Sequence, residues 1–139
     1  MTLEIRPAQE TDEAAIAALW AACGLVVPYN DPARDFRFAR AKANSDVLVA
    51  MLGGEIAGSV MVGHDGHRGW IYYLAVAPGH RRGGIGKALV EAAERWLAGR
   101  GVAKLQLMVR ESNTEVVGFY ESLGFETAPR TILQKWLNK

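Results

Sequence analysis

Glycines and cations are concentrated in one short segment, Ala77–Lys87, which follows a β-rich run and precedes an apolar helical pattern. Glycine lets the backbone come close to a ligand, because it has no side chain in the way. The unpaired amides at the start of a helix and the helix dipole together favour an anion at such a point. We therefore expect a phosphate group to be bound by Arg81, Arg82, Gly83, Gly84, Gly86 and Lys87.

Two common nucleotide-binding motifs do not fit this segment. A P-loop needs glycine at the position of Arg81 and a serine or threonine at that of Ala88. A dinucleotide-binding fingerprint that starts at Gly84-Ile85-Gly86 needs glycine where the chain has Leu89. The phosphate must therefore belong to another kind of ligand.

A second group of residues follows further along the chain and consists of Asn113, Tyr120 and Leu123-Gly124-Phe125. Together with Arg81-x-x-Gly84-x-Gly86 and the preceding run Leu74–Pro78, this order of motifs resembles the GNAT N-acetyltransferases. The resemblance covers almost the whole chain. It implies an α/β fold with a central twisted mixed sheet flanked by helices. It also implies an enzyme that moves the acetyl group of acetyl-CoA directly to a primary amine.

The resemblance further implies where the cofactor lies. In the family, the strand that corresponds to Trp70–Val76 separates from the one at Lys104–Val109 at a bulge, and the pantetheine arm occupies the gap. An amide near Val76 then holds the thioester carbonyl and stabilises the oxyanion. The cofactor-binding residues implied in this way are Leu74, Ala75, Val76, Arg81, Arg82, Gly83, Gly84, Gly86, Lys87, Asn113 and Tyr120.

Tyr120 matches the family's usual general acid. A tyrosine pKa of about 10 lies above a thiol pKa of about 8.5, so full protonation of the departing thiolate is uphill by ~2 kcal/mol. We therefore expect a hydrogen bond that strengthens as the sulfur gains charge. A purely structural role stays open, because Tyr120 shares a helical face with Val116 and Phe119. For Asn113, a helix cap and a contact with CoA are equally open.

The general base is where the sequence departs from the family. Members carry glutamate at the position of Tyr72 or of Met108, and neither residue present here accepts a proton at neutral pH. The base lies elsewhere, water carries the proton, or the acceptor amine is weakly basic. The remaining candidates are Asp31, Asp35, His64, Asp65, His67 and Glu111, of which the middle three also fit an ordinary polar turn. Two histidines and an aspartate are too few to predict a metal site.

The segment Leu25–Asp35 is more apolar than a linker requires, and we expect it to shape the acceptor pocket. Asp31 is also suited to cap a helix that begins at Pro32. The tentative acceptor-binding residues are Tyr29, Asn30, Asp31 and Tyr72. The acceptor itself, a small molecule or a peptide or protein amine, is not defined by the sequence. A catalytically weak regulatory module that binds acyl-CoA is the alternative function.

Apolar periodicity and turn residues predict the order β-α-α-β-β-β-α-β-α-β in one domain, residues 1–139. A hairpin at Gly53-Gly54 makes one part of the sheet antiparallel, and a βαβ unit makes another part parallel. We expect helices near residues 16–23, 32–43, 85–97 and 116–123. We expect strands near residues 3–5, 47–52, 55–62, 70–76, 104–109 and 131–136.

Composition narrows the class of protein further. The 139 residues include 16 lysines and arginines against 15 aspartates and glutamates, so no overall basic field attracts nucleic acid or an anionic membrane. The single cysteine, Cys23, lies on an apolar helical face and fits a buried position in a protein of the reducing cytoplasm. We see no signal peptide and no membrane-spanning run. The oligomeric state stays open, a homodimer included.

Overall fold

The computed structural model describes residues 2–138 and divides into two compact units, which meet at the Leu107–Met108 bond. The first unit is a five-stranded sheet in the order β1-β2-β3-β4-β5. Its first four strands are antiparallel and β5 is parallel to β4. The mixed sheet is therefore confirmed. The strands are β1 (Leu3–Pro7), β2 (Ser45–Leu52), β3 (Glu55–His64), β4 (Gly69–Val76) and β5 (Leu105–Gln106).

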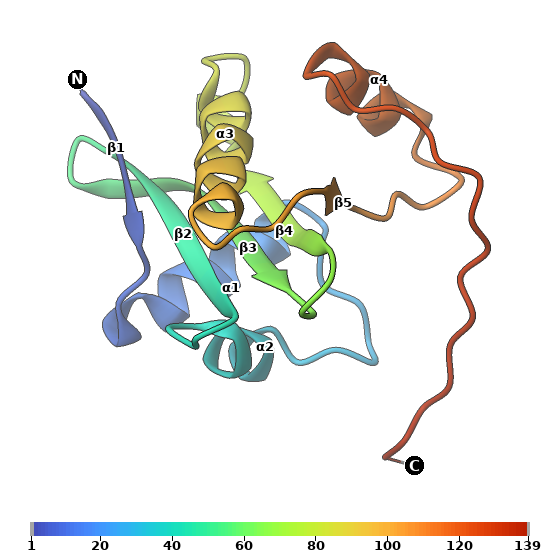
Figure 1. Ribbon diagram of the computed structural model, residues 1–139. Helices are drawn as coiled ribbons and strands as arrows, with labels where there is room; N and C mark the ends of the chain where they lie inside the picture. Colours follow the sequence, from blue (N-terminus) through green and yellow to red (C-terminus); the bar gives the residue numbers. More distant parts are fainter. Residues whose placement is uncertain (1, 139) are drawn as a thin grey trace. The chain divides into compact units, whose positions relative to one another are not determined.

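Helices cover both faces of this sheet, with α3 in front of it and α1 and α2 behind it in the view of Figure 1. The helices are α1 (Glu13–Ala22), α2 (Pro32–Ala39) and α3 (Ile85–Ala98), with short 3-10 turns η1 (Glu10–Asp12) and η2 (Pro78–His80). A Cβ on Gly58 of β3 would lie 3.0 Å from Leu89 and 3.1 Å from Ile85, which explains why α3 approaches the sheet so closely.

The opposite face of the sheet packs on α1 through a fully buried tryptophan. Trp20 has no exposed surface, and its Nε1–H donates to the Ser59 hydroxyl of β3 at 2.8 Å. Trp20 also lies in one cluster with Ile16, Phe36 and Val49. The buried hydroxyl thus gives the indole its hydrogen-bond partner within an apolar core.

The hairpin between β2 and β3 is formed as predicted. Gly53 and Gly54 both have positive φ, 60° and 79°, which suits a two-residue turn that requires the left-handed region at both positions. Helix α2 is shorter than predicted, because it ends at Ala39 and not near Ala43. Ser45 caps its last turn by donating to the Ala39 carbonyl at 2.8 Å, and Ala41 has a φ of 56°.

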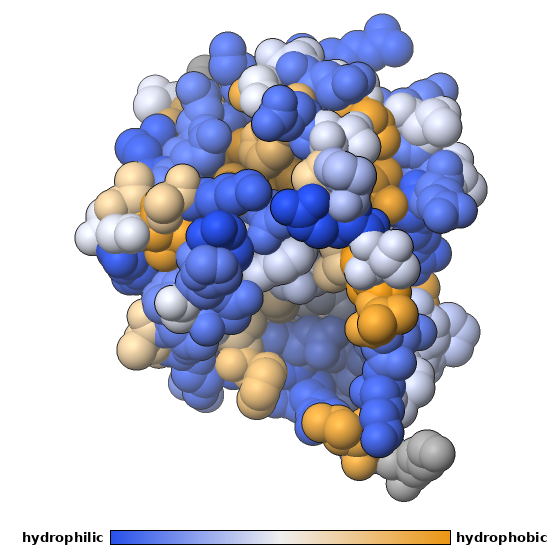
Figure 2. Space-filling model, turned by 45° about the vertical axis from the view of Figure 1, so that its right-hand side comes forward, coloured by the Kyte–Doolittle hydropathy of each residue, from blue (hydrophilic) through white to orange (hydrophobic). Residues whose placement is uncertain are grey.

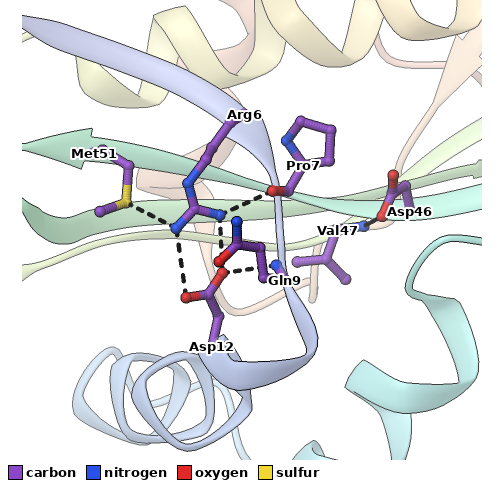
Figure 3. A network of polar contacts seen from close by, with 7 residues as sticks. All are labelled: Arg6, Pro7, Gln9, Asp12, Asp46, Val47 and Met51. Atoms are coloured by element: carbon purple, nitrogen blue, oxygen red, sulfur yellow. Dashed lines mark hydrogen bonds and ion pairs between the residues drawn. The ribbon is translucent and has the colours of Figure 1, made fainter.

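An ion pair fastens β1 to the turn before α1. Arg6 Nη1 donates to Asp12 Oδ2 at 2.9 Å, and the Gln9 amide donates to the same oxygen at 2.7 Å (Figure 3). Arg6 also reaches the Met51 sulfur of β2 at 3.6 Å. The hydrogen bond from Arg6, followed by that from the Gln9 backbone, lowers the pKa of Asp12 against the opposing effect of burial. This network sets where the first helix leaves the sheet.

The second unit contains one helix, α4 (Thr114–Ser122), in the residues described. Gly124 follows with a φ of 94°, as expected of a glycine that ends a helix. The strand predicted at Thr131–Trp136 is wrong, since these residues pair with no strand in residues 2–138. An isolated strand cannot pair the N–H and C=O groups of its backbone with a neighbouring strand, and the side chains of Ile132 and Leu133 are exposed. Figure 2 shows a mostly hydrophilic face on which hydrophobic residues form small separate groups.

Candidate functional site

The glycine-rich turn joins the end of β4 to the start of α3. Gly84 is the residue before the helix and has a φ of 80°, a conformation that glycine adopts at little cost. Arg82 also has positive φ, 70°. Two left-handed residues so close together bend the chain sharply, so that the helix starts with its amides facing out of the turn.

The backbone N–H groups of Ile85, Gly86 and Lys87 donate to no partner within residues 2–138. The first turn of α3 carries no acidic residue. A Cβ on Gly84 would meet nothing within 4 Å, and one on Gly83 only the His80 carbonyl at 3.6 Å. Open space, free amides and cations at Arg81, Arg82 and Lys87 suit a diphosphate.

The turn is tied to the strand that precedes it. Arg81 Nε donates to the Val76 carbonyl at 3.3 Å, and the Cys23 thiol donates to the same oxygen at 3.3 Å. The end of β4 is thereby held between α1 and the turn. Cys23 is half-buried and packs against the core, which fits the position expected for it.

Strand β4 has an open edge next to this turn. It pairs with β5 only at Gly69↔Leu105 and Trp70↔Gln106, so the part from Ile71 to Val76 has no partner on that side among the residues described. The predicted strand Lys104–Val109 is thus wrong in length, since β5 covers two residues. Leu74, Ala75 and Val76 lie in the unpaired part of the edge, where a ligand can bind backbone groups.

A bulge lies within this open part of β4. Between the pairs Ser59↔Ala75 and Met61↔Tyr72, β4 contains one residue more than β3, and Tyr73 has a φ of 51°. Residues directly opposite each other in an antiparallel pair share a face. Tyr72 therefore lies on the side of Met61, and Tyr73 packs on the same cluster as Met61. The bulge brings two consecutive tyrosines to the face covered by α1 and α2.

Tyr73 is held by contacts that sequence reasoning missed. Its ring stacks on Trp20 with centroids 3.9 Å apart and planes at 6°, and its hydroxyl donates to Asp35 Oδ2 of α2 at 2.7 Å. Burial, followed by the hydrogen bond and the charge of Asp35, raises the pKa of Tyr73 well above its usual range. Strict strand alternation would send Tyr73 to the other face, so no pattern in the sequence indicated these contacts.

The predicted acceptor residues are divided between structural and open positions. Asp31 caps α2, since its Oδ1 accepts from the amides of Ala33 and Arg34 at 3.1 and 3.2 Å. Asn30 is exposed, and Tyr29 is 64% exposed. Tyr72 is 44% exposed, and burial followed by the charge of Asp65 raises its pKa. Asp31 thus has a structural role as a helix cap, and the side chain of Asn30 forms a hydrogen bond with that of Tyr73.

An open hollow of about 200 Å³ adjoins Tyr72 on the sheet. Its lining includes Trp70, His64 and Asp65. Asp65 Oδ1 accepts from the amides of His67 and Arg68 at 2.9 and 2.7 Å, and Oδ2 accepts from Trp70 Nε1 at 3.2 Å. The amide of Arg68, then that of His67, lower the pKa of Asp65 to about 2. These are ordinary turn contacts. Within the described residues, no three or more histidine, cysteine, aspartate or glutamate side chains are grouped so that they could hold a metal ion.

Tyr120 and Asn113 belong to the second unit. The Tyr120 ring is 9% exposed and packs edge-on against Phe119 and Phe125, with centroids 5.1 and 5.3 Å away. Burial raises its pKa to about 12. No side-chain oxygen buried within residues 2–138 lacks a partner, and no internal hydrogen bond involves its hydroxyl, so the hydroxyl reaches solvent. Asn113 precedes α4 without a capping bond from its side chain.

Comparison with known proteins defines the class of protein. Residues 11–125 match the model of the acetyltransferase (GNAT) family. The fold is similar to that of an Escherichia coli ribosomal-protein-S18-alanine N-acetyltransferase, with a TM-score of 0.79 and 27% identity over 92% of this chain and 80% of that one. It is also similar to a Trypanosoma brucei acetyltransferase, with a TM-score of 0.74 and 26% identity over 97% and 100% of the two chains.

Nearer relatives agree with this class. An acetyltransferase of Pectobacterium atrosepticum is 46% identical over 97% of this chain and 96% of its own length. An uncharacterized N-acetyltransferase of Yersinia pestis is 45% identical over the same shares. The chain therefore belongs to the acetyltransferase (GNAT) family, and it is an enzyme that uses acetyl-CoA. No helix within residues 2–138 has the length and apolar character needed to cross a membrane.

Proposed function

We propose that this enzyme moves the acetyl group of acetyl-CoA directly to a primary amine of a small molecule, peptide or protein. One observation carries the proposal: the open edge of β4, from Ile71 to Val76, runs straight into the turn whose amides have no internal partner. A thioester on a long arm with a diphosphate at its far end matches these two adjacent features. No side chain is needed as a covalent carrier.

The turn and the strand edge would share the work of binding. The amides of Ile85, Gly86 and Lys87, with Arg81 and Arg82, hold the diphosphate. Backbone groups of Leu74, Ala75 and Val76 orient the arm, and an amide near Val76 donates to the thioester oxygen as it gains charge. Acetyl-CoA, when bound, supplies the activated acetyl group. The chain contributes position and oriented dipoles, which is how proximity accelerates transfer between two bound reactants.

Tyr120 would assist the departure of the thiolate. A pKa of about 12 makes the phenol a weaker acid than a thiol, so it keeps its proton and stabilises the sulfur by a hydrogen bond. A packed ring with a hydroxyl that reaches solvent supports this role. Asn113 would contact the CoA chain, since its side chain is not used as a cap.

The test measures both products of the transfer. The purified chain is incubated with acetyl-CoA and a panel of amino acids, peptides, alkylamines and aminosugars. We expect free thiol to appear in step with a mass increase of one acetyl group on at least one amine. Thiol release without any acetylated amine would leave hydrolysis only, and would contradict the proposed acceptor class. A parallel incubation without the protein measures the thiol that acetyl-CoA releases without the enzyme.

A further inference from the structure

The Asp35 carboxylate of α2 is half-buried and has no cation beside it. Its Oδ2 accepts from the Tyr73 hydroxyl at 2.7 Å, and no lysine, arginine or histidine within residues 2–138 forms an ion pair with it. A carboxylate removed from water is stabilised by a paired cation or by several hydrogen bonds. Asp35 has one such bond, so an oxygen remains for a positively charged ligand.

The position of this carboxylate relates it to the proposed transfer. Tyr73 lies in the open part of β4, directly before Leu74–Val76. The bulge turns Tyr73 toward α1 and α2, whereas α3 covers the other face of the sheet (Figure 1). The turn proposed for the diphosphate leads into α3, so Asp35 and that helix lie on opposite faces of the sheet. An acceptor that enters on the side of Asp35 meets the strand edge without crossing the cofactor's path.

The chemistry of amines decides which nitrogen Asp35 can bind. An aliphatic amine is mostly protonated at neutral pH and must lose a proton before its nitrogen can attack the thioester. A carboxylate beside the reacting nitrogen would favour its ammonium form, which has no lone pair to attack the thioester. Asp35 is therefore suited to a charged nitrogen that does not react.

We propose that Asp35, positioned by Tyr73, anchors a second ammonium group of the acceptor, which makes the preferred acceptor a diamine or a larger polycationic amine. This inference rests on the proposed function. The anchored nitrogen keeps its charge and is not acetylated. The reacting nitrogen loses one proton to water before attack and a second as its bond to the acetyl carbon forms and the carbon–sulfur bond breaks. The departing thiolate takes up one of these protons.

A series of matched substrates tests the anchor. Straight-chain diaminoalkanes are compared with the monoaminoalkanes of the same carbon number, with acetyl-CoA at saturation. We expect kcat/KM to be higher for the diamine at one chain length or over a narrow range, and to be nearly independent of length for the monoamines. Because the anchor is an ion pair, the preference for the diamine should weaken as salt is added.

Two variants separate anchoring from folding. Asp35→Asn should reduce the ratio of diamine to monoamine kcat/KM by about tenfold or more, mainly through the KM of the diamine, as expected for loss of a charge-assisted hydrogen bond. Tyr73→Phe keeps the stacking on Trp20 and removes only the hydroxyl that positions Asp35, so it should reduce the ratio less. Glu94→Gln is the matched control, because it removes one negative charge from an exposed position on α3 and should leave the ratio unchanged.

The outcomes distinguish the anchor from the proposed function. If no amine of the wider panel of amino acids, peptides, alkylamines and aminosugars is acetylated, the proposed function is wrong. If other amines of that panel are acetylated but neither alkylamine series is, the anchor is overturned although the function stands. If monoamines and diamines of every length are acetylated equally well, the anchor is absent although the function stands. An equal fall for both substrate classes in Asp35→Asn, with a lowered melting temperature, would make Asp35 a structural tie between α2 and β4 and would also overturn the proposal.

Discussion

The indole ring of Trp20 lies parallel to the phenol ring of Tyr73, with 3.9 Å between the centroids and 6° between the planes. Trp20 is also held by its hydrogen bond to Ser59, and Tyr73 occupies the bulge of β4. The core of the first unit is thus in direct contact with the strand that we propose binds the thioester. Changes in this contact should affect both stability and catalysis.

Replacing Trp20 by phenylalanine should lower the free energy of unfolding by about 1–3 kcal/mol, because the Ser59 hydroxyl is left buried without a partner. Ser59→Ala alone should also destabilise, because the indole N–H then loses its acceptor. In the double variant the loss should be smaller than the sum of the two, which a double-mutant cycle in denaturant measures. Strict additivity would mean that the hydrogen bond contributes little.

Acetyl-CoA should raise the melting temperature, because it binds the folded chain. At about a hundred times its dissociation constant the gain in the free energy of unfolding should be about 2.7 kcal/mol. Thermal unfolding over a range of acetyl-CoA concentrations measures the effect. A melting temperature that does not change with the ligand would contradict binding at the turn.

Gly83→Val should weaken acetyl-CoA binding and leave the stability of the free protein almost unchanged. A Cβ at Gly83 meets only the His80 carbonyl at an ordinary distance of 3.6 Å, so the side chain projects into the space proposed for the diphosphate. Gly84→Ala should behave differently and cost about 1–2 kcal/mol of stability, because Gly84 has left-handed backbone angles. Calorimetry and thermal unfolding of both variants separate loss of the ligand site from backbone strain.

Tyr120→Phe should lower kcat by up to ~10²-fold while the dissociation constant of acetyl-CoA stays nearly the same. The ring contacts with Phe119 and Phe125 are kept in this variant, so the melting temperature should change little. A folded variant that turns over at the parent's rate would assign Tyr120 to the core alone. Steady-state rates and titration of the cofactor decide between these outcomes.

Asp12→Asn should reduce stability near neutral pH by about 1 kcal/mol or more, through loss of charge-assisted bonds with Arg6 and the Gln9 amide. Because the hydrogen bond from Arg6 lowers the pKa of Asp12, the carboxylate stabilises the fold above the unfolded pKa of about 4. That contribution is lost as the pH falls through the lowered pKa. Denaturant midpoints of the two proteins should therefore differ at about pH 7 and converge in strong acid.

The elements that depend on local chemistry were predictable from the sequence. The Gly53-Gly54 turn, the Asp31 cap and the glycine-rich start of α3 each follow from conformations that one or two residue types favour. Longer elements such as α3 were also predictable, because the regular spacing of their apolar residues indicates which face is buried. The motifs around Arg81–Gly86 and Tyr120 also indicated the family that the comparisons show.

Contacts between distant segments depend on the tertiary structure. The alternation of a regular strand sends Tyr72 and Tyr73 to opposite faces, and only the pairing of β4 with β3 defines the extra residue that brings both to one face. The hydrogen bond between Tyr73 and Asp35 depends on that bulge and on the packing of α2. Neither of these features produces a periodic pattern in the sequence. Sequence alone therefore determined the turn and the class of enzyme, whereas tertiary packing decided which carboxylate lies beside the reactive edge, because register and packing are properties of paired segments.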